Sequence, residues 1–290
     1  MVEDRKHDAD SGKVVGVLSM DMSKAFDSLY PSLLLSKFKE YGLSDNGTAL
    51  MQSYFTGRQN KIHLGKTESD WVKIHKGCPQ GSSFGPMLWN IYQNDIFYLD
   101  TKSQLSAFAD DHQLYCSSVD PDQVMNIINS DGDLTSKWYG DNFLECNLSK
   151  YQAIVIHNNF NAPFKFEINN NGIYPKDNLK LLGITLDDRL SFSEHISCIC
   201  TKVSKLIGVL MRLRNLIPTT AKLCLYKSAI LPHLTYCSLV WHFCKTSDRK
   251  NLERVNERGL RAVFCNWSTT YEDLLARGKL TTLYNRRLQN

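Results

Sequence analysis

No stretch of about 18 consecutive apolar residues occurs in this chain, and this absence argues against a membrane-spanning helix. The first residues, MVEDRKHDADSGK, are too polar for a secretory signal peptide. The nine cysteines are an odd number without regular spacing, so they do not indicate a disulfide framework. Together these absences predict reduced thiols, a cytoplasmic or nuclear location and no membrane partner.

Hydrophobic residues make up 42% of the 290 residues, which is enough to form a large core. The net charge is only +4, yet residues 212–261 hold ten Lys and Arg against three Asp and Glu, a local charge of +7. The rest of the chain therefore sums to −3. A basic C-terminal part indicates a polyanionic partner, although a solvated basic face has the same composition.

Apolar periodicity and turn residues predict a mixed α/β region followed by a helical one. The expected strands are 14–20, a hairpin over 61–77, a second hairpin over 104–116, 151–156 and 179–186. The expected helices are 31–41, 45–56, 86–99, 121–139 and those after about 193, with an exposed hairpin inside 157–178. The fold class is therefore α+β, with domains at 1–190 and 191–290.

The stretch SAFADDHQLYC, residues 106–116, places Asp110 and Asp111 at the turn of a predicted hairpin. Aspartate is a common turn residue, so a purely structural reading is available. A second pair, Asp187 and Asp188, differs because it leads into SFSEH, where Ser191 and Glu194 have capping-box spacing before a helix. The first pair is thus the candidate for chemistry.

A third carboxylate, Asp21, ends the apolar strand VVGVLSM. If the 104–116 hairpin pairs beside that strand, the three carboxylates converge and repel unless a cation neutralises them. Oxygen ligands without His or Cys select Mg²⁺ or Mn²⁺ over zinc. Two such ions are the usual machinery of phosphoryl transfer, which this arrangement predicts.

Five segments resemble, in order, the palm motifs of reverse transcriptases: MDMSKAFDSL (20–29), GCPQGSSFGPMLWNIYQNDI (77–96), FADD (108–111), LECNLSK (144–150) and LKLLGITLD (179–187). The similarity is greatest to LINE-type, non-LTR retrotransposon enzymes. The tail, LYKSAILPHLTYCSLVWHFC and then LERVNERGLRAVF, resembles their thumb. The resemblance implies a right-hand palm over 1–190, an antiparallel sheet backed by helices, followed by a helical thumb over 191–290. Fingers should be largely absent, because nothing before Val14 reads as a folded basic surface.

The resemblance also implies roles for individual residues. Asp21, Asp110 and Asp111 would bind the metal ions, with Asp111 the less essential. Lys150 would protonate the departing pyrophosphate. Phe26 would exclude a ribose 2′-hydroxyl, although an ordinary core aromatic is the alternative reading.

The remaining implied roles concern substrate and primer. Gln80 and Gly81 would contact template and incoming nucleotide, since glycine lets the backbone approach a base closely. Leu182 and Gly183 would hold the primer end. Lys24 and Asp27 read as local support for the first motif.

A helix over 249–264 offers a check that does not depend on the resemblance. One face is apolar: Leu252, Val255, Gly259 and Ala262. The other forms a basic stripe: Lys250, Arg254, Arg258 and Arg261. This stripe suits a nucleic-acid backbone or, equally, a solvated face.

The sequence therefore predicts an RNA-directed DNA polymerase domain whose partners are an RNA template, a DNA primer and deoxynucleoside triphosphates. The alternative is a catalytically inactive, nucleic-acid-binding remnant. A viral RNA-dependent RNA polymerase is a further alternative, but Phe26 and Ala109 favour the reverse transcriptase. A zinc site at His233, Cys237, His242 and Cys244 is disfavoured, because the spacing matches no ordinary zinc module.

Overall fold

The computed structural model describes residues 2–22, 24–79, 81–157 and 164–289. The chain divides into two compact units, one formed by residues 8–176 and the other by residues 1–7 with 177–290. The division precedes the sequence-based boundary near 190, because the hairpin over 178–187 packs on the first long helix that follows it. We call them the sheet unit and the helical unit.

The sheet unit is built on a four-stranded antiparallel sheet in the order β6-β7-β1-β8. The strands are β1 (Val14–Asp21), β6 (Gln104–Phe108), β7 (Asp111–Ser118) and β8 (Gln152–Ile156). β1 and β7 are central, as the continuous apolar run of β1 requires, because it is buried on both faces. The predicted strand at 14–20 and the predicted hairpin at 104–116 are confirmed.

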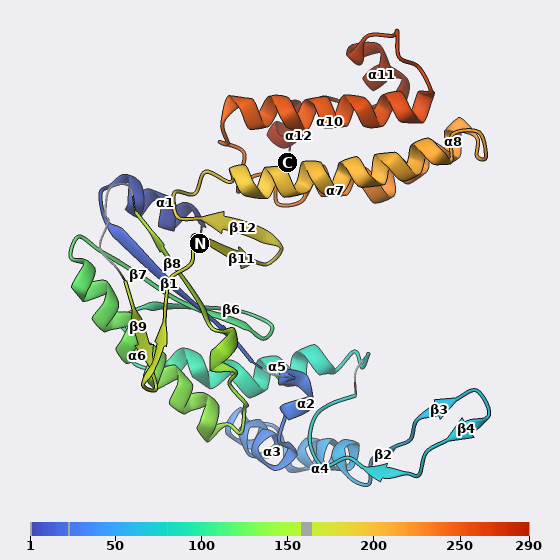
Figure 1. Cartoon of the computed structure of the whole chain (residues 1–290). Coiled ribbons are helices and arrows are strands. Elements are labelled where there is room, and N and C mark those ends of the chain that lie inside the picture. The colour runs from blue at the N-terminus through green and yellow to red at the C-terminus, as the bar shows by residue number, and fades with distance from the viewer. Residues whose placement is uncertain (1, 23, 80, 158–163, 290) are drawn as a thin grey trace. The chain divides into compact units, whose positions relative to one another are not determined.

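Helix α6 (Pro121–Asp141) covers one face of this sheet (Figure 1). Its approach is close at Gly16, where an added Cβ would lie 2.6 Å from Val124 Cγ1. Leu18, Met20 and Leu114 turn toward the same core with Ile128. The small residue in β1 therefore lets α6 pack directly on the strand that ends in Asp21.

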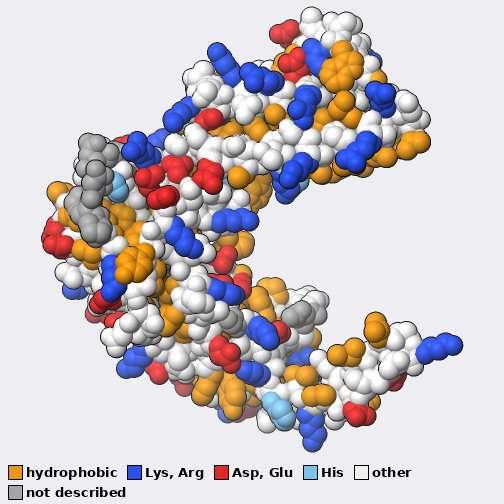
Figure 2. All heavy atoms as spheres, viewed as in Figure 1, with side chains coloured by type: hydrophobic (Ala, Val, Ile, Leu, Met, Phe, Trp, Pro, Cys, Tyr) orange, Lys and Arg blue, Asp and Glu red, His pale blue; other side chains and the backbone are white. Residues whose placement is uncertain are grey.

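Short helices and an extended arm follow β1. The elements are α2 (Ala25–Ser28), α3 (Pro31–Glu40), α4 (Asp45–Phe55), β2 (Gln59–Asn60), β3 (His63–Leu64), β4 (Thr67–Glu68) and β5 (Val72–Lys73). The arm, residues 59–73, pairs β2 with β5 and β3 with β4, which confirms the expected hairpin. It leaves Ile62, Leu64 and Trp71 exposed, and hydrophobic side chains line it in Figure 2.

The chain then returns to the sheet through α5 (Gly85–Gln93) and the 3₁₀ turn η1 (Asn94–Tyr98). Buried Lys37 of α3 ties these elements together, since its Nζ donates to Asp95 Oδ1 at 2.9 Å and to Asn142 Oδ1 at 2.6 Å. The predicted helix from Pro86 thus changes to a tighter 3₁₀ turn for its last residues.

The last part of the sheet unit corrects one expectation. The 3₁₀ turn η2 (Leu148–Lys150) leads into β8, and β9 (Phe166–Ile168) then pairs with β10 (Asn171–Ile173). This hairpin is not exposed: Phe166, Ile168 and Ile173 are buried, and β9 packs on α6. Its polar composition hid three apolar positions that face the helix.

The helical unit begins with a second correction. The expected single strand at 179–186 is a hairpin of β11 (Asn178–Leu181) and β12 (Ile184–Asp187). Leu182 and Gly183 form its turn with φ angles of 45° and 86°. Both angles lie in the left-handed region that a two-residue hairpin turn requires, and only one of the two residues is glycine, so the turn signal was weak.

Helices make up the rest of this unit, as predicted. They are α7 (Ser193–Arg212), α8 (Thr219–Leu225), the π-helical turn η3 (Tyr226–Ile230), α9 (Leu231–Thr235), α10 (Thr246–Phe264), α11 (Tyr271–Gly278) and α12 (Leu283–Gln289). α7 and α10 pack against each other along their apolar faces. At Gly259 an added Cβ would lie 2.7 Å from Tyr226 Cε2, so this glycine lets η3 contact α10.

Residues before Val14 are more ordered than the sequence indicates, since α1 (Val2–Asp10) is helical. Asp8 at its end accepts hydrogen bonds from Lys13 Nζ at 2.9 Å and Ser117 Oγ at 2.8 Å. Among the described residues, no helix is both long enough and apolar enough to cross a membrane.

His112 is a buried, neutral histidine at the centre of the sheet unit. Its Nε2 donates to Gln93 Oε1 at 2.9 Å, so its Nδ1 accepts from the Tyr139 hydroxyl at 2.8 Å. Burial lowers the pKa of His112 to about 4. The strand residue next to Asp111 is thereby locked between α5 and α6.

His112 should make stability depend on mildly acidic pH. Its folded-state pKa lies below the ordinary value of 6.5, so its contribution is complete above pH 6.5 and is lost as pH falls toward about 4. The loss should reach about 3 kcal/mol in free energy of unfolding. Urea denaturation across this range should give a flatter profile for His112→Gln than for the wild type. His75→Gln, at an exposed histidine, should keep the wild-type slope; equal slopes in all three proteins would contradict this assignment.

Candidate active site

Two carboxylates face each other where the central strands end. Asp21, the last residue of β1, is paired in register with Asp111, the first residue of β7. Like charges directly opposite on antiparallel strands destabilise a sheet. The geometry therefore brings together two of the three predicted metal ligands, and Asp110 adjoins them in the turn between β6 and β7.

The charges of the other two carboxylates affect the pKa of Asp111. Partial burial raises the pKa of Asp111, and the neighbouring charges of Asp110 and Asp21 raise it further. A cation at this place would remove that repulsion, and an all-carboxylate donor set is suited to Mg²⁺ or Mn²⁺.

The turn that contains Asp110 has a strained backbone, which a hydrogen bond from α5 stabilises. Ala109 has a φ of 52°, a left-handed conformation that is unfavourable for a residue with a Cβ. The buried indole of Trp89, on α5, donates a hydrogen bond to the Ala109 carbonyl at 2.7 Å. No sequence pattern singled out Trp89, because an apolar helix face predicts only a core residue.

Lys150 lies at the same strand end. An isolated bridge between Met22 and Cys146 brings the segment before η2 beside the end of β1. Lys150 Nζ then forms an ion pair with Asp21 Oδ2 at 3.1 Å, with both side chains about half exposed. The fourth predicted catalytic residue is thus in contact with the first.

The three carboxylates do not form a ready-made metal cage. Within the described ranges, no group of three or more His, Cys, Asp or Glu side chains is arranged to hold a metal ion. Asp21 is turned to Lys150. The donor chemistry fits a divalent cation, and in this structure one oxygen of Asp21 is occupied by the Lys150 ammonium.

Phe26 is connected to the acidic turn by its contact with the Trp89 ring. It is half-buried, and its ring centroid lies 5.4 Å from that of Trp89. Backbone bonds join its segment to the glycine-rich loop, since Cys78 N donates to Phe26 O at 3.1 Å and Gly77 N donates to Leu29 O at 2.7 Å. The first two motifs are thereby held side by side.

Gly77 makes that contact possible. Its φ is +85°, and an added Cβ would lie 2.8 Å from the Asp27 backbone. Gly81, farther along the loop, is exposed with a φ of +82° and open space around it. Gln80 lies outside the described residues.

Leu182 and Gly183 belong to the helical unit, where they form the β11-β12 turn. The Tyr236 hydroxyl donates to the Leu182 carbonyl at 2.8 Å, so the turn is fixed to the segment after α9. Asp187, at the end of the same hairpin, accepts from the backbone N–H groups of Ser191 and Phe192. Asp187 thus prepares the start of α7, which confirms that this pair leads into a helix; the helix begins at Ser193, so Ser191 is not its N-cap.

The four residues of the predicted basic stripe on α10 do not have the same environment. Lys250, Arg254 and Arg258 are exposed, and the apolar residues of the opposite face are buried. Arg261 differs, because it pairs with Glu257 at 2.6 Å and donates to Thr269 O at 3.1 Å. Those contacts hold the loop after α10 and leave three residues of the stripe open to solvent.

The disfavoured zinc site does not form. His242 stacks on Tyr284, with ring centroids 5.6 Å apart, while Cys244 is buried and Cys237 exposed. None of the described His and Cys residues belongs to a group that could hold a metal.

Comparison with known proteins places this geometry in a family. The family model described as "Reverse transcriptase (RNA-dependent DNA polymerase)" matches residues 1–186. The "Probable RNA-directed DNA polymerase from transposon X-element" of Drosophila melanogaster is 26% identical over 95% of this chain and 31% of its own length. The "Retrovirus-related Pol polyprotein from type-1 retrotransposable element R1" of Bradysia coprophila is 28% identical over 79% of this chain and 23% of its own. The chain therefore spans less than a third of these relatives.

Solved structures agree on the fold. A structure of telomerase from Candida albicans, in complex with a fragment of telomeric RNA, aligns with 97% of this chain and 52% of its own at a TM-score of 0.50 and 13% identity. Apo telomerase from Candida tropicalis aligns with 95% of this chain and 46% of its own at the same TM-score and 12% identity. From the family match and the retrotransposon relatives, the chain belongs to the reverse transcriptase (RNA-dependent DNA polymerase) family, of the non-LTR, LINE-type kind.

Proposed function

We propose that this chain is the palm and thumb portion of a non-LTR retrotransposon reverse transcriptase and takes part in RNA-directed DNA synthesis. The observation that carries the proposal is the cross-strand pairing of Asp21 with Asp111, next to Asp110 in the turn. The sheet unit would form most of the palm, and the helices after residue 190 would form the thumb; the β11-β12 hairpin, which carries the last palm motif, belongs to the helical unit. RNA template, DNA primer and deoxynucleoside triphosphates are the proposed partners.

Asp21 and Asp110 would hold Mg²⁺ or Mn²⁺ most directly, and Asp111 would assist. Such ions activate the attacking oxygen and stabilise the leaving phosphate. Because Asp21 is paired with Lys150, a cation at Asp21 would release this lysine. Lys150 would then be free to donate a proton to the departing pyrophosphate.

Other residues would position the substrates. Phe26 would occupy the space that a ribose 2′-hydroxyl needs, and Gly81 would let the loop backbone approach the base pair. Leu182 and Gly183 would contact the primer end. Lys250, Arg254 and Arg258 would follow the nucleic-acid backbone.

The second candidate is a catalytically inactive protein that binds nucleic acid. The ion pair of Asp21 with Lys150 favours it, since a carboxylate neutralised by lysine has less affinity for a metal ion. Primer–template binding that weakens with salt, without incorporation of any nucleotide, would support this candidate over the polymerase.

The carboxylate pair can be tested by isosteric substitution. Asp110→Asn should lower Mg²⁺-dependent extension of a DNA primer on an RNA template by at least about 100-fold. Asp188→Asn is the matched control, because Asp188 lacks the capping bonds of Asp187 and should leave extension unchanged. Mn²⁺ binding, followed by electron paramagnetic resonance, should fall in the first variant only. Equal behaviour of both variants in both assays would remove the case for Asp110.

Sugar discrimination should depend on Phe26. Phe26→Ala should raise incorporation of ribonucleotides relative to deoxynucleotides by about 10-fold or more, because the ring no longer fills the 2′ position. Phe38→Leu, a substitution in the same core, should cost stability and leave that ratio unchanged. A ratio that does not move in an active Phe26→Ala enzyme would make Phe26 a core residue only.

Trp89 should act as a positioning residue through its N–H. Trp89→Phe keeps an aromatic ring and removes the bond to Ala109, so kcat should fall about 10-fold while KM for the template stays the same. Trp138→Phe is the control, since the buried Trp138 indole nitrogen has no hydrogen-bond partner within the described ranges. Similar losses in both variants would mean that packing, and not the hydrogen bond, matters.

A further inference from the structure

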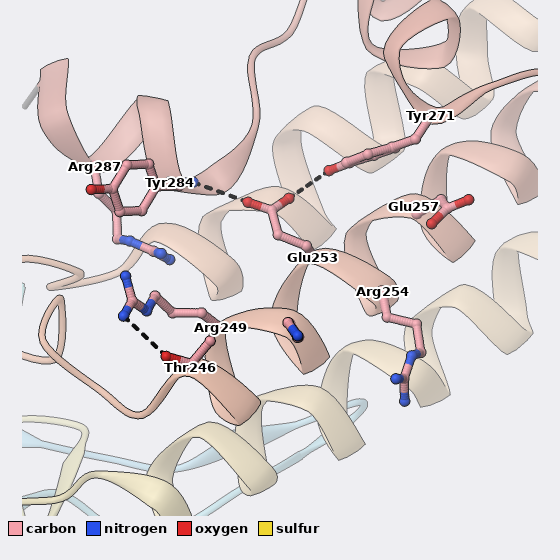
Figure 3. Close-up of a pocket in the computed structure, with 9 residues that line it drawn as sticks. Thr246, Arg249, Glu253, Arg254, Glu257, Tyr271, Tyr284 and Arg287 are labelled. Carbon is pink, nitrogen blue, oxygen red and sulfur yellow. Dashed lines mark hydrogen bonds between the residues drawn. The ribbon is translucent and has the colours of Figure 1, made fainter.

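Two arginines in the helical unit have buried guanidinium nitrogens without a hydrogen-bond acceptor among the described residues. Arg287, on α12, is 2% exposed, yet its Nε and Nη1 meet no hydrogen-bond acceptor among the described residues. Arg249, on α10, has an unpartnered Nε as well. Figure 3 shows the two guanidinium groups extending toward each other at one cavity. A buried, permanently charged group without a partner is costly, so this arrangement indicates a missing anion.

Aromatic rings hold both arginines in place. Arg287 lies over the Trp241 ring at 5.2 Å from its centroid, and Arg249 lies over the Tyr284 ring at 5.9 Å. Arg249 Nη2 also donates to Thr246 Oγ1 at 3.5 Å. A cation–π contact occupies no N–H donor, so the nitrogens without an acceptor remain available to a ligand.

Two carboxylates also line the cavity, and both accept hydrogen bonds from groups other than the two arginines. Glu253 accepts from the Tyr271 hydroxyl at 2.6 Å and from the Tyr284 backbone N–H at 3.0 Å (Figure 3). Glu257 is paired with Arg261. Neither Arg249 nor Arg287 forms an ion pair within the described ranges of the chain.

The cavity itself is basic. It measures about 460 Å³, and Lys250 and Arg254 line it together with the two arginines. Four cations thus line the space against two carboxylates, Glu253, whose charge acts on Arg287, and Glu257, which is paired with Arg261. The planar, forked donors of two arginines match an oxyanion with several oxygens, and they repel any cation.

We propose that this cavity binds a phosphate group between Arg249 and Arg287. The group has two possible sources, a phosphodiester of a bound nucleic-acid strand or a free phosphate. The first source is supported by Lys250 and Arg254, which belong both to the cavity wall and to the exposed stripe of α10. The nucleic-acid source rests on the proposed function, whereas the first test requires neither nucleic acid nor catalysis.

The first test measures thermal unfolding of the full chain with increasing inorganic phosphate, at ionic strength held constant with chloride. The wild type should show a midpoint that rises with phosphate concentration, because a ligand that binds only the folded state stabilises it. Arg287→Met and Arg249→Gln should lose this rise. Arg277→Gln, at an exposed arginine on α11 outside the cavity, should keep it.

The unliganded state gives a second, opposite signature. In phosphate-free buffer, Arg287→Met should be at least as stable as the wild type, because it removes an unpaired buried charge. If Arg287 served only to hold α12, the same variant would be less stable in both buffers. Arg249→Gln, on the facing wall, reports phosphate binding independently should Arg287→Met fail to fold.

A second arm distinguishes the sources of the phosphate. Affinity for an RNA–DNA duplex is measured against salt concentration; if a phosphodiester enters the cavity, Arg287→Met should reduce the slope of log affinity against log salt by about one. An unchanged slope together with a phosphate-dependent rise in the first test assigns the cavity to a free phosphate. No phosphate-dependent rise in the wild type, or an equal rise in the wild type and both cavity variants, overturns the proposal.

Discussion

The antiparallel register of β1 with β7 is the constraint on which the candidate site depends. A shift by one residue would place Asp21 opposite His112 or Asp110, and would turn the side chains of the shifted strand to the opposite face of the sheet. The close contact of Gly16 with α6 favours the observed register, because only a residue without a Cβ fits at that position of the buried strand β1. The free energy of this core therefore holds together two carboxylates that would otherwise move apart.

The same core supports the turn between β6 and β7. His112 is fixed by Gln93 and Tyr139, and Trp89 binds the carbonyl of the strained Ala109. Both Gln93 and Trp89 lie on α5, directly after the glycine-rich loop. One helix thus connects the loop proposed to contact the nucleotide with the turn that carries the acidic pair, and strain at Ala109 is offset by contacts outside the turn.

The helical unit uses its charged residues in three ways. Asp187 and Arg261 are structural, since each satisfies backbone groups at the boundary of a helix. Lys250, Arg254 and Arg258 are exposed on α10 and suit a long polyanion. Arg287 is buried and Arg249 is partly buried, and both have a buried Nε without an acceptor among the described residues, which distinguishes them from the exposed stripe. Sequence position does not separate these roles, because arginines of all three kinds occur within or next to α10.

The sequence by itself determined the order of the elements and the candidate acidic pair. Periodicity located β1, the hairpin at Asp110 and Asp111, and the long helices, because a core-facing strand or helix must repeat its apolar residues at its own period. It also distinguished Asp187 from Asp110 by the helix start that follows Asp187. It missed the turn at Leu182 and Gly183 and the burial of Phe166, where one left-handed leucine and a polar context concealed the pattern.

Only the tertiary structure decided which distant groups meet. The Asp21–Lys150 ion pair, the Trp89–Ala109 hydrogen bond and the Arg249–Arg287 cavity each join residues from separate elements. A local pattern contains no information on such contacts, because they depend on how side chains from several elements fill one volume. For the same reason Arg261 and Arg258, neighbours on one predicted stripe, differ in the structure. Arg261 contacts Glu257 and a loop carbonyl, whereas Arg258 is exposed and donates only to the Ser204 carbonyl of α7 among the described residues.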